Sequence, residues 1–253
     1  MKNKLFLIIL SAALLFATGC SKSNTLEPTA TLSSKKPVST ADPSVVKTFE
    51  NFIYYIQDET IVIKGYDGDP ESLVIPDRID GMAVTKIDET AFYQKLRLQS
   101  ITLPKTLETI GSSAFYRCYR LASVYIPAKV KTIETNPFFR CSSLQVISVS
   151  EENLNYTSIE GSLYSKDGRV LFVHPEGRTE DVFYIPDSVD TIGTSAFGYY
   201  SLCKKISIPS GVINFPSGAL SVFPDELQLI VSPGSAAEEY AIATGMDYRL
   251  QEE

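Results

Sequence analysis

Tryptophan is absent from this chain of 253 residues, and histidine occurs only once, at His174. One imidazole cannot supply the clustered ligands of a typical zinc site, and the G-x-S-x-G motif of serine hydrolases is also missing. The chain has no C-x-x-C pair and no glycine-rich phosphate loop. We therefore expect no catalytic residues, no metal and no cofactor. We expect His174, which precedes a proline at the end of a predicted hairpin, to be an exposed loop residue.

Positive charge is scarce relative to negative charge. The chain carries 23 Lys and Arg residues against 30 Asp and Glu residues, which gives a formal net charge of -7. A protein of this charge repels the phosphate backbone, which is bound mainly through Lys and Arg. Nucleic acid is therefore not an expected partner.

No apolar run is long enough for a transmembrane helix. The longest, Leu5–Ala17, is interrupted by Ser11 and is shorter than the roughly 20 residues that a span requires. Lys2 and Lys4 precede it and small residues follow it, so residues 1–19 have the three parts of a secretory signal peptide.

The end of this leader, Ala17-Thr18-Gly19-Cys20, resembles a bacterial lipobox, in which the cysteine thiol is alkylated by a lipid before cleavage. The resemblance implies lipidation at Cys20 and anchoring to a bacterial membrane. Ordinary secretion with an incidental cysteine is the alternative. Residues 20–45 then form a tether, because more than half of the residues after Cys20 are Ser, Thr or Pro and show no apolar periodicity.

A repeat of 23 residues dominates the rest of the sequence. The stretch LQSITLPKTLETIGSSAFYRCYRL, residues 98–121, is followed at once by a similar stretch, LASVYIPAKVKTIETNPFFRCSSL, residues 121–144. A fixed period of this size predicts a solenoid in which each repeat is one coil, stacked on the next. The Leu, Ile and Phe positions of the repeat are expected to point inward and stack on their equivalents. Gly111 and Gly193 are expected at tight turns of the coil.

The period is interrupted twice and flanked by two caps. The first coil, residues 73–92, has an extra loop at Asp80-Gly81-Met82, and a later coil is 13 residues longer than the period. The insertion is placed at about 151–179, with the 13 extra residues at Gly161–Val173, where Asp167-Gly168 predicts a hairpin turn. Alternating residues at 52–64 predict an N-terminal β-hairpin cap within about 46–70, and Ser235 begins a capping box that predicts a helix ending at Gly245 within about 232–253.

The pattern I(x)IP…(V/L)xxIxxxAFxxCxxL resembles the BspA-type leucine-rich repeat of bacterial cell-surface lipoproteins, over roughly residues 50–250 of a repeat domain predicted at 46–253. The resemblance implies a right-handed, β-rich solenoid with a parallel sheet on one face and short strands or 3₁₀ turns on the other. It implies roles in adhesion and in host or matrix interaction, and it brings no shared catalytic residues. We therefore expect an exported protein at the bacterial cell surface.

Two local patterns leave alternatives open. Cys118 and Cys141 occupy the same slot in neighbouring coils, so they either form a disulfide or remain as two small buried thiols. Asp67 and Asp69 flank Gly68 and either ligate calcium or simply form a turn.

The strand residues between the inward slots should face outward on the sheet, and they include few charges and no carboxylate. Such a surface favours binding of another protein, of host, matrix or bacterial surface origin, although Val, Thr and Tyr also favour strands for local reasons. The candidate ligand-binding residues are Thr102, Ser123, Tyr125, Val146, Ser148, Tyr184, Lys205 and Ser207. Two further outward positions of these rows are Val74 and Ile230.

Two alternatives to protein binding follow from other parts of the chain. A glycan-binding or nutrient-capture module would use an aromatic groove on the inserted hairpin, with Tyr156, Tyr164 and Phe172. A hydrolase would require a carboxylate cluster outside the sheet face.

Overall fold

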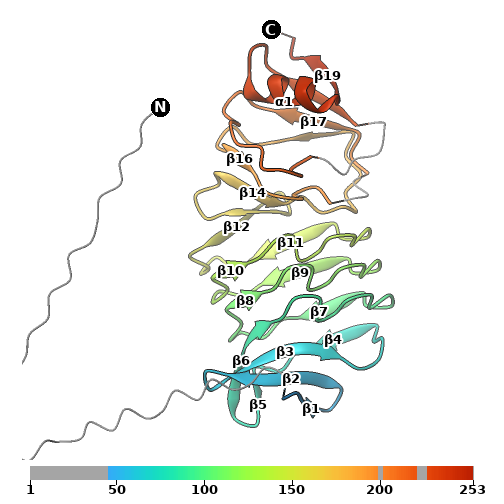
Figure 1. The fold of residues 1–253 in the computed structure, drawn as a ribbon, viewed down its shortest axis with the longest axis vertical. Helices are drawn as coiled ribbons and strands as arrows, with labels where there is room; N and C mark the ends of the chain where they lie inside the picture. The colour runs from blue at the N-terminus through green and yellow to red at the C-terminus, as the bar shows by residue number, and fades with distance from the viewer. Residues whose placement is uncertain (1–44, 199–201, 221–226, 253) are drawn as a thin grey trace, which may run out of the picture. The chain divides into compact units, whose positions relative to one another are not determined.

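The computed structural model describes residues 45–198, 202–220 and 227–252. The predicted signal peptide, Cys20 and nearly all of the tether lie outside these residues. The described residues form 19 β-strands and one α-helix, stacked as a solenoid of successive coils (Figure 1).

The first face of the solenoid consists of eight parallel strands in two separate sheets. Their orders are β11-β9-β7-β4 and β15-β17-β18-β19, so each coil adds one strand (Figure 1). The bounds in the first sheet are β4 Ser72–Val74, β7 Ser100–Thr102, β9 Ser123–Ile126 and β11 Val146–Val149. The bounds in the second sheet are β15 Val182–Tyr184, β17 Lys205–Ile208, β18 Gln228–Val231 and β19 Asp247–Leu250.

A seven-stranded sheet forms another side of the first coils. Its order is β1-β2-β3-β6-β8-β10, with β5 paired to β6. The predicted N-terminal hairpin is confirmed: β2 and β3 are antiparallel, and β3 then pairs in parallel with β6, so the cap extends the sheet of the coils. The bounds are β1 Lys47–Phe49, β2 Phe52–Gln57, β3 Thr60–Tyr66, β5 Arg78–Ile79, β6 Met82–Ile87, β8 Thr109–Ile110 and β10 Thr132–Ile133.

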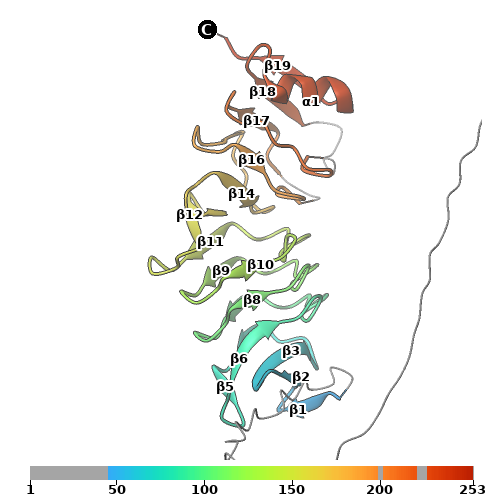
Figure 2. The ribbon, with the colours of Figure 1, turned by 60° about the vertical axis from the view of Figure 1, so that its left-hand side comes forward.

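The insertion builds a further sheet, β12-β13-β14-β16, between the two halves of the first face (Figure 2). Strands β13 and β14 are antiparallel around Asp167 and Gly168, and β14 pairs in parallel with β16. The hairpin contributes side chains to two separate hydrophobic clusters, Leu163 to the first and Leu171 to the second. The insertion therefore divides both the sheet and the core. The bounds are β12 Tyr156–Ile159, β13 Ser162–Ser165, β14 Val170–Val173 and β16 Thr191–Ile192.

The inward slots of the repeat form ladders, as the period predicts. Phe92, Phe115 and Phe138 are buried and stacked, with ring centroids 5.2 Å and 5.5 Å apart and interplanar angles of 3° and 15°. These spacings are close to the ≈4.8 Å between neighbouring strands. Burying each side chain of this kind contributes about 1.5–3 kcal/mol to stability.

The cysteines at equivalent positions of neighbouring coils are also stacked one above the other in the core. Cys118 and Cys141 are buried free thiols, and each Sγ lies 3.2 Å from a carbonyl oxygen of the preceding coil, that of Phe92 or Phe115. Burial raises the pKa of Cys118 to about 12 and that of Cys141 well above its usual value. The structure therefore supports the alternative of two small buried thiols, and it contains no bond between them.

The C-terminal helix α1, Ala236–Thr244, is confirmed. The Ser235 side chain accepts a hydrogen bond from the Glu238 N–H, and Gly245 ends the helix in the left-handed region with φ 71°. The sequence reading missed the strand that follows, since β19 pairs in parallel with β18 and adds an eighth strand to the first face.

Gly111 and Gly193 each begin a turn of the coil, as expected: the Ala114 N–H donates to the Gly111 carbonyl at 3.3 Å, and the Ala196 N–H donates to the Gly193 carbonyl at 3.1 Å. Neither glycine has a positive φ, so the turns do not require its conformational freedom. Both glycines are required instead because the backbone of the preceding coil approaches them closely. A Cβ at Gly111 would lie 2.6 Å from the Glu89 nitrogen, and one at Gly193 would lie 2.9 Å from the Leu171 carbonyl oxygen.

We predict that Gly111→Ala lowers the free energy of unfolding by about 1–3 kcal/mol, because the added methyl group forces two coil backbones apart. Gly211→Ala is the matched control, since its Cβ would meet nothing closer than 3.6 Å. That variant should change stability by no more than about 0.5 kcal/mol. Urea unfolding of the two variants measures the difference, and equal stability would contradict the close-approach explanation.

Candidate binding surface

The outward side chains of β4, β7, β9 and β11 form a surface without any charge, which we call the uncharged face. It contains three apolar side chains that are well exposed, Val74 (64%), Tyr125 (54%) and Val146 (43%). The remaining members carry hydroxyl groups. The uncharged face is made of Ser72, Val74, Ser100, Thr102, Ser123, Tyr125, Val146 and Ser148.

Strand pairing sets the order of side chains on this face. Ser72, Ser100, Ser123 and Val146 occupy matching positions on successive strands, and the Ser100 hydroxyl lies 2.9 Å from that of Ser72. Tyr125 is paired directly with Ser148. The structure thus brings together five predicted site residues on one sheet: Thr102, Ser123, Tyr125, Val146 and Ser148.

The other three predicted residues belong to the second sheet. Tyr184 lies on β15, and Lys205 and Ser207 lie on β17, so a continuous row from Tyr125 to Tyr184 does not exist. Ile230, expected to face outward, is buried at 7% exposure, so that expectation was wrong; the side chains in register with it are Ser207 on β17 and Arg249 on β19. Strand β19 also brings the charged residues Asp247 and Arg249 to this sheet.

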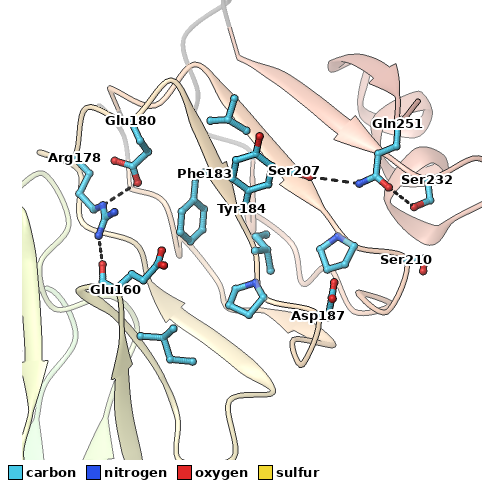
Figure 3. A pocket seen from close by; sticks show the side chains of 15 residues that line it. Glu160, Arg178, Glu180, Phe183, Tyr184, Asp187, Ser207, Ser210, Ser232 and Gln251 are labelled. Atoms are coloured by element: carbon cyan, nitrogen blue, oxygen red, sulfur yellow. Dashed lines mark hydrogen bonds and ion pairs between the residues drawn. The ribbon is translucent and has the colours of Figure 1, made fainter. Parts of the chain in front are cut away.

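A groove of about 670 Å³ lies at β15, where the insertion separates the two sheets (Figure 3). One wall comes from the turn after β12 and the segment that leads into β15, with Glu160, Arg178 and Glu180. Tyr184, which is 68% exposed, projects in the middle. Asp187 and Gln251 lie towards the other end (Figure 3).

Hydrogen bonds hold both ends of the groove. The Arg178 Nε lies 2.8 Å from Glu180 Oε1, and the same guanidinium also donates to the Glu160 carbonyl oxygen. At the other end, Ser232 Oγ donates to Gln251 Oε1 at 2.9 Å, and the Gln251 amide lies 3.4 Å from Ser207 Oγ.

Acidic groups outnumber basic groups in the groove. Three carboxylates, those of Glu160, Glu180 and Asp187, and one guanidinium, that of Arg178, give its lining a net charge of -2. The Glu180 carboxylate is paired with the Arg178 guanidinium at 2.8 Å. Asp187 lies at the far end of the groove from Glu180 (Figure 3). The excess of negative charge in the lining favours binding of a cationic ligand.

His174 lies behind this wall and is fully buried, so the expectation of an exposed loop histidine was wrong. Its Nδ1 lies 3.1 Å from Ser162 Oγ, and its ring packs against that of Phe183 with centroids 4.0 Å apart and planes tilted by 37°. Its Nε2 is 3.4 Å from Glu180 Oε1 but lacks hydrogen-bond geometry with it. Burial, and secondarily the nearby Arg178 charge, lower the pKa of His174 to about 3.

We predict that His174 stays neutral in the folded protein throughout pH 5–8. The unfolded side chain has a pKa near 6.5, so the stabilisation from burying the neutral ring is complete above that pH. It declines by about 1.4 kcal/mol for each pH unit as the pH falls from 6.5 towards the folded pKa. The single imidazole signal can be followed by NMR, with the urea-unfolded protein as control. A folded-state titration midpoint near 6.5 would contradict the buried neutral ring.

The aromatic groove expected on the inserted hairpin is not present. Tyr156 and Tyr164 are buried, at 6% and 1% exposure, and Phe172 packs edge-on against Tyr156. The Tyr156 hydroxyl accepts a hydrogen bond from the Ile133 N–H at 2.8 Å. These residues stabilise the junction between the insertion and the coils and do not form a sugar-binding platform.

The Asp67-Gly68-Asp69 segment is a turn, with Gly68 at φ 101°. The Lys95 ammonium lies 2.7 Å from the carbonyl oxygens of Tyr66 and Gly68, so a cation from the chain itself already occupies these oxygens. Across residues 45–198, 202–220 and 227–252, no group of three or more His, Cys, Asp or Glu side chains could hold a metal ion. The same part of the chain contains no helix that is long and apolar enough to cross a membrane.

Sequence reasoning missed the groove residues Glu160, Arg178, Glu180 and Gln251. The first three lie within the predicted insertion or just after it, so the break in the 23-residue period was the available signal. Gln251 reaches the groove only through β19, which carries no recognisable repeat pattern.

Comparisons with solved structures give similarities of fold. A leucine-rich repeat protein from Eubacterium ventriosum is 21% identical, with a TM-score of 0.45 over 73% of this chain and 64% of that chain. The leucine-rich repeat protein of T. pallidum is 19% identical, with a TM-score of 0.47 over 80% and 97%. The pneumococcal vaccine antigen PcpA is 13% identical, with a TM-score of 0.44 over 83% and 99%. Nothing about function follows from similarities at this level.

The present chain spans 64% of the length of the Eubacterium ventriosum protein. A search of curated proteins finds no match. The sequence profile described as BspA type leucine rich repeat region matches residues 70–170 and 180–237, in six copies. Proteins of this kind are bacterial surface proteins. The chain therefore belongs to the BspA-type leucine-rich repeat family.

Proposed function

We propose that this protein is a lipid-anchored, non-enzymatic surface protein whose uncharged face binds another protein of a host, its matrix or a bacterial surface. The lipid on Cys20 would hold it on the membrane, and residues 20–45 would act as a flexible tether. Membership in a family of bacterial surface proteins supports the location, and the leucine-rich repeat fold is typically an interaction scaffold.

The uncharged face itself carries this proposal. Its eight outward side chains include no Asp, Glu, Lys or Arg, although these residues make up 21% of the chain. Depletion of charge around exposed aromatic and apolar side chains is typical of the centre of a protein interface. Strand propensity explains Val74, Thr102 and Tyr125, but it gives no reason for three serines in register at positions 72, 100 and 123.

Binding can be tested with the domain Pro43–Glu253, titrated against matrix proteins, host cell surfaces and polysaccharides. We predict that Tyr125→Lys weakens binding of a protein partner at least about tenfold, because it places an unpaired charge at the centre of the uncharged face. Ile213→Lys is the matched control: Ile213 is a 65% exposed apolar residue outside both sheets, and its replacement should leave affinity unchanged.

Thermal unfolding should be the same for both variants. If Tyr125→Lys binds as tightly as the parent, the uncharged face is only scaffold. If polysaccharide alone is bound, the glycan-capture function replaces protein binding.

The lipid anchor can be tested with the full chain expressed in a bacterium. We predict that the parent partitions into the membrane and detergent fractions, since acyl chains contribute about 0.8 kcal/mol per buried methylene. Cys20→Ser should move the protein to the aqueous fraction, whereas Ser23→Ala should leave its partition unchanged. A parent protein that is aqueous and lacks acyl mass on its N-terminal peptide would indicate ordinary secretion.

A further inference from the structure

Strand β15 has an open edge at the groove. In the uninterrupted coils each strand of the first face pairs with the strand of the next coil, so β11 would pair with β15. The insertion takes that place on β11: the Ile147 N–H donates to the Gly161 carbonyl at 2.8 Å, and Ser158 Oγ donates to the Ile147 carbonyl at 2.6 Å. Among the described strands, β15 therefore pairs only with β17.

The hydrogen bonds between β15 and β17 show which backbone groups of β15 point away from β17. The Ile185 N–H donates to the Ser207 carbonyl at 3.0 Å, which fixes one residue that faces β17. Since backbone groups alternate between the two edges of a strand, Phe183 also faces β17, whereas Val182 and Tyr184 face the other edge. Each of those two residues thus presents one N–H and one C=O at the groove, spaced as an added strand requires.

We propose that this groove binds an extended, basic peptide segment of a partner protein as an added strand on β15. The peptide would form main-chain hydrogen bonds with Val182 and Tyr184. Addition of a strand to an open sheet edge is a common way in which proteins bind extended peptides. The net charge of -2, contributed by Glu160, Glu180 and Asp187 against Arg178, selects Lys or Arg side chains. The exposed Tyr184 ring offers an apolar and cation–π contact to the same side chains.

The site is separate from the uncharged face, because β15 and Tyr125 belong to different sheets. It does not depend on the function proposed above. Tyr125→Lys should leave peptide binding at the groove unchanged, so failure of one proposal does not imply failure of the other.

The test uses the full-length protein in detergent and three fluorescent hexapeptides, (Lys-Thr)3, (Gln-Thr)3 and (Glu-Thr)3, titrated by anisotropy. Threonine favours the extended conformation in all three peptides. The lysine peptide should bind most tightly and the glutamate peptide most weakly. Glu160→Gln/Asp187→Asn should reduce the preference for lysine. Equal affinity for the lysine and glutamate peptides would overturn the charge argument.

The backbone contact is tested by comparing Tyr184→Pro with Tyr184→Ala. Both variants lose the ring, but only proline lacks the N–H, and proline is tolerated on an edge strand when that N–H points away from its neighbour. We predict at least about tenfold weaker peptide binding by the proline variant than by the alanine variant, the effect of a lost buried hydrogen bond. Equal affinities would overturn strand addition.

A second measurement holds even if the proline variant does not fold. N-methylation of the lysine peptide at successive positions should weaken binding to the parent protein at alternate positions only, because an added strand turns every second N–H towards β15. A uniform effect of methylation would contradict strand addition. Displacement of the peptide by maltohexaose or a chitin hexamer would instead make the groove a glycan site.

Discussion

Each coil of this protein must place the same side chain and the same backbone path about 4.8 Å from those of its neighbour. The Phe92–Phe115–Phe138 ladder meets this constraint with stacked rings, and Cys118 meets it with a thiol that lies against the carbonyl of the coil before it. At Gly111 the constraint leaves no room even for a methyl group. Stability therefore resides largely in contacts between adjacent coils.

This regular spacing is interrupted at the insertion between β11 and β15, and the groove lies there. The insertion adds a hairpin whose two strands divide their side chains between the hydrophobic clusters on either side, so burial is preserved while strand pairing is not. On β11, the backbone groups of Ile147 form hydrogen bonds with Gly161 and Ser158 of the insertion. On β15, no strand replaces β11 as a neighbour. Open strand edges invite pairing with other chains, and natural proteins usually cover them. An edge lined by Glu160, Glu180 and Asp187 is protected from association between identical acidic chains.

The sequence predicts those parts of the fold that repeat. Alternation within each strand predicts that Tyr125 and Val146 face outward, and the period predicts which residues stack inside. It does not predict His174, whose burial depends on Ser162 and Phe183, brought to it by the path of the insertion. Nor does it predict β19, where the polar stretch DYRL has no inward slots and is recognised as a strand only through its pairing with β18.

The two candidate surfaces suit partners of different chemistry. The uncharged face offers Val74, Tyr125 and hydroxyl groups, whose contacts do not depend on salt and which favour a partner with a flat, mixed surface. The groove offers carboxylates and an open backbone edge, so attraction there is screened by salt and needs an extended chain. Both surfaces come from one repeat. Where the coils follow the period, neighbouring strands satisfy the backbone groups and only side chains remain for recognition. Where the insertion separates β11 from β15, the backbone of β15 itself becomes available.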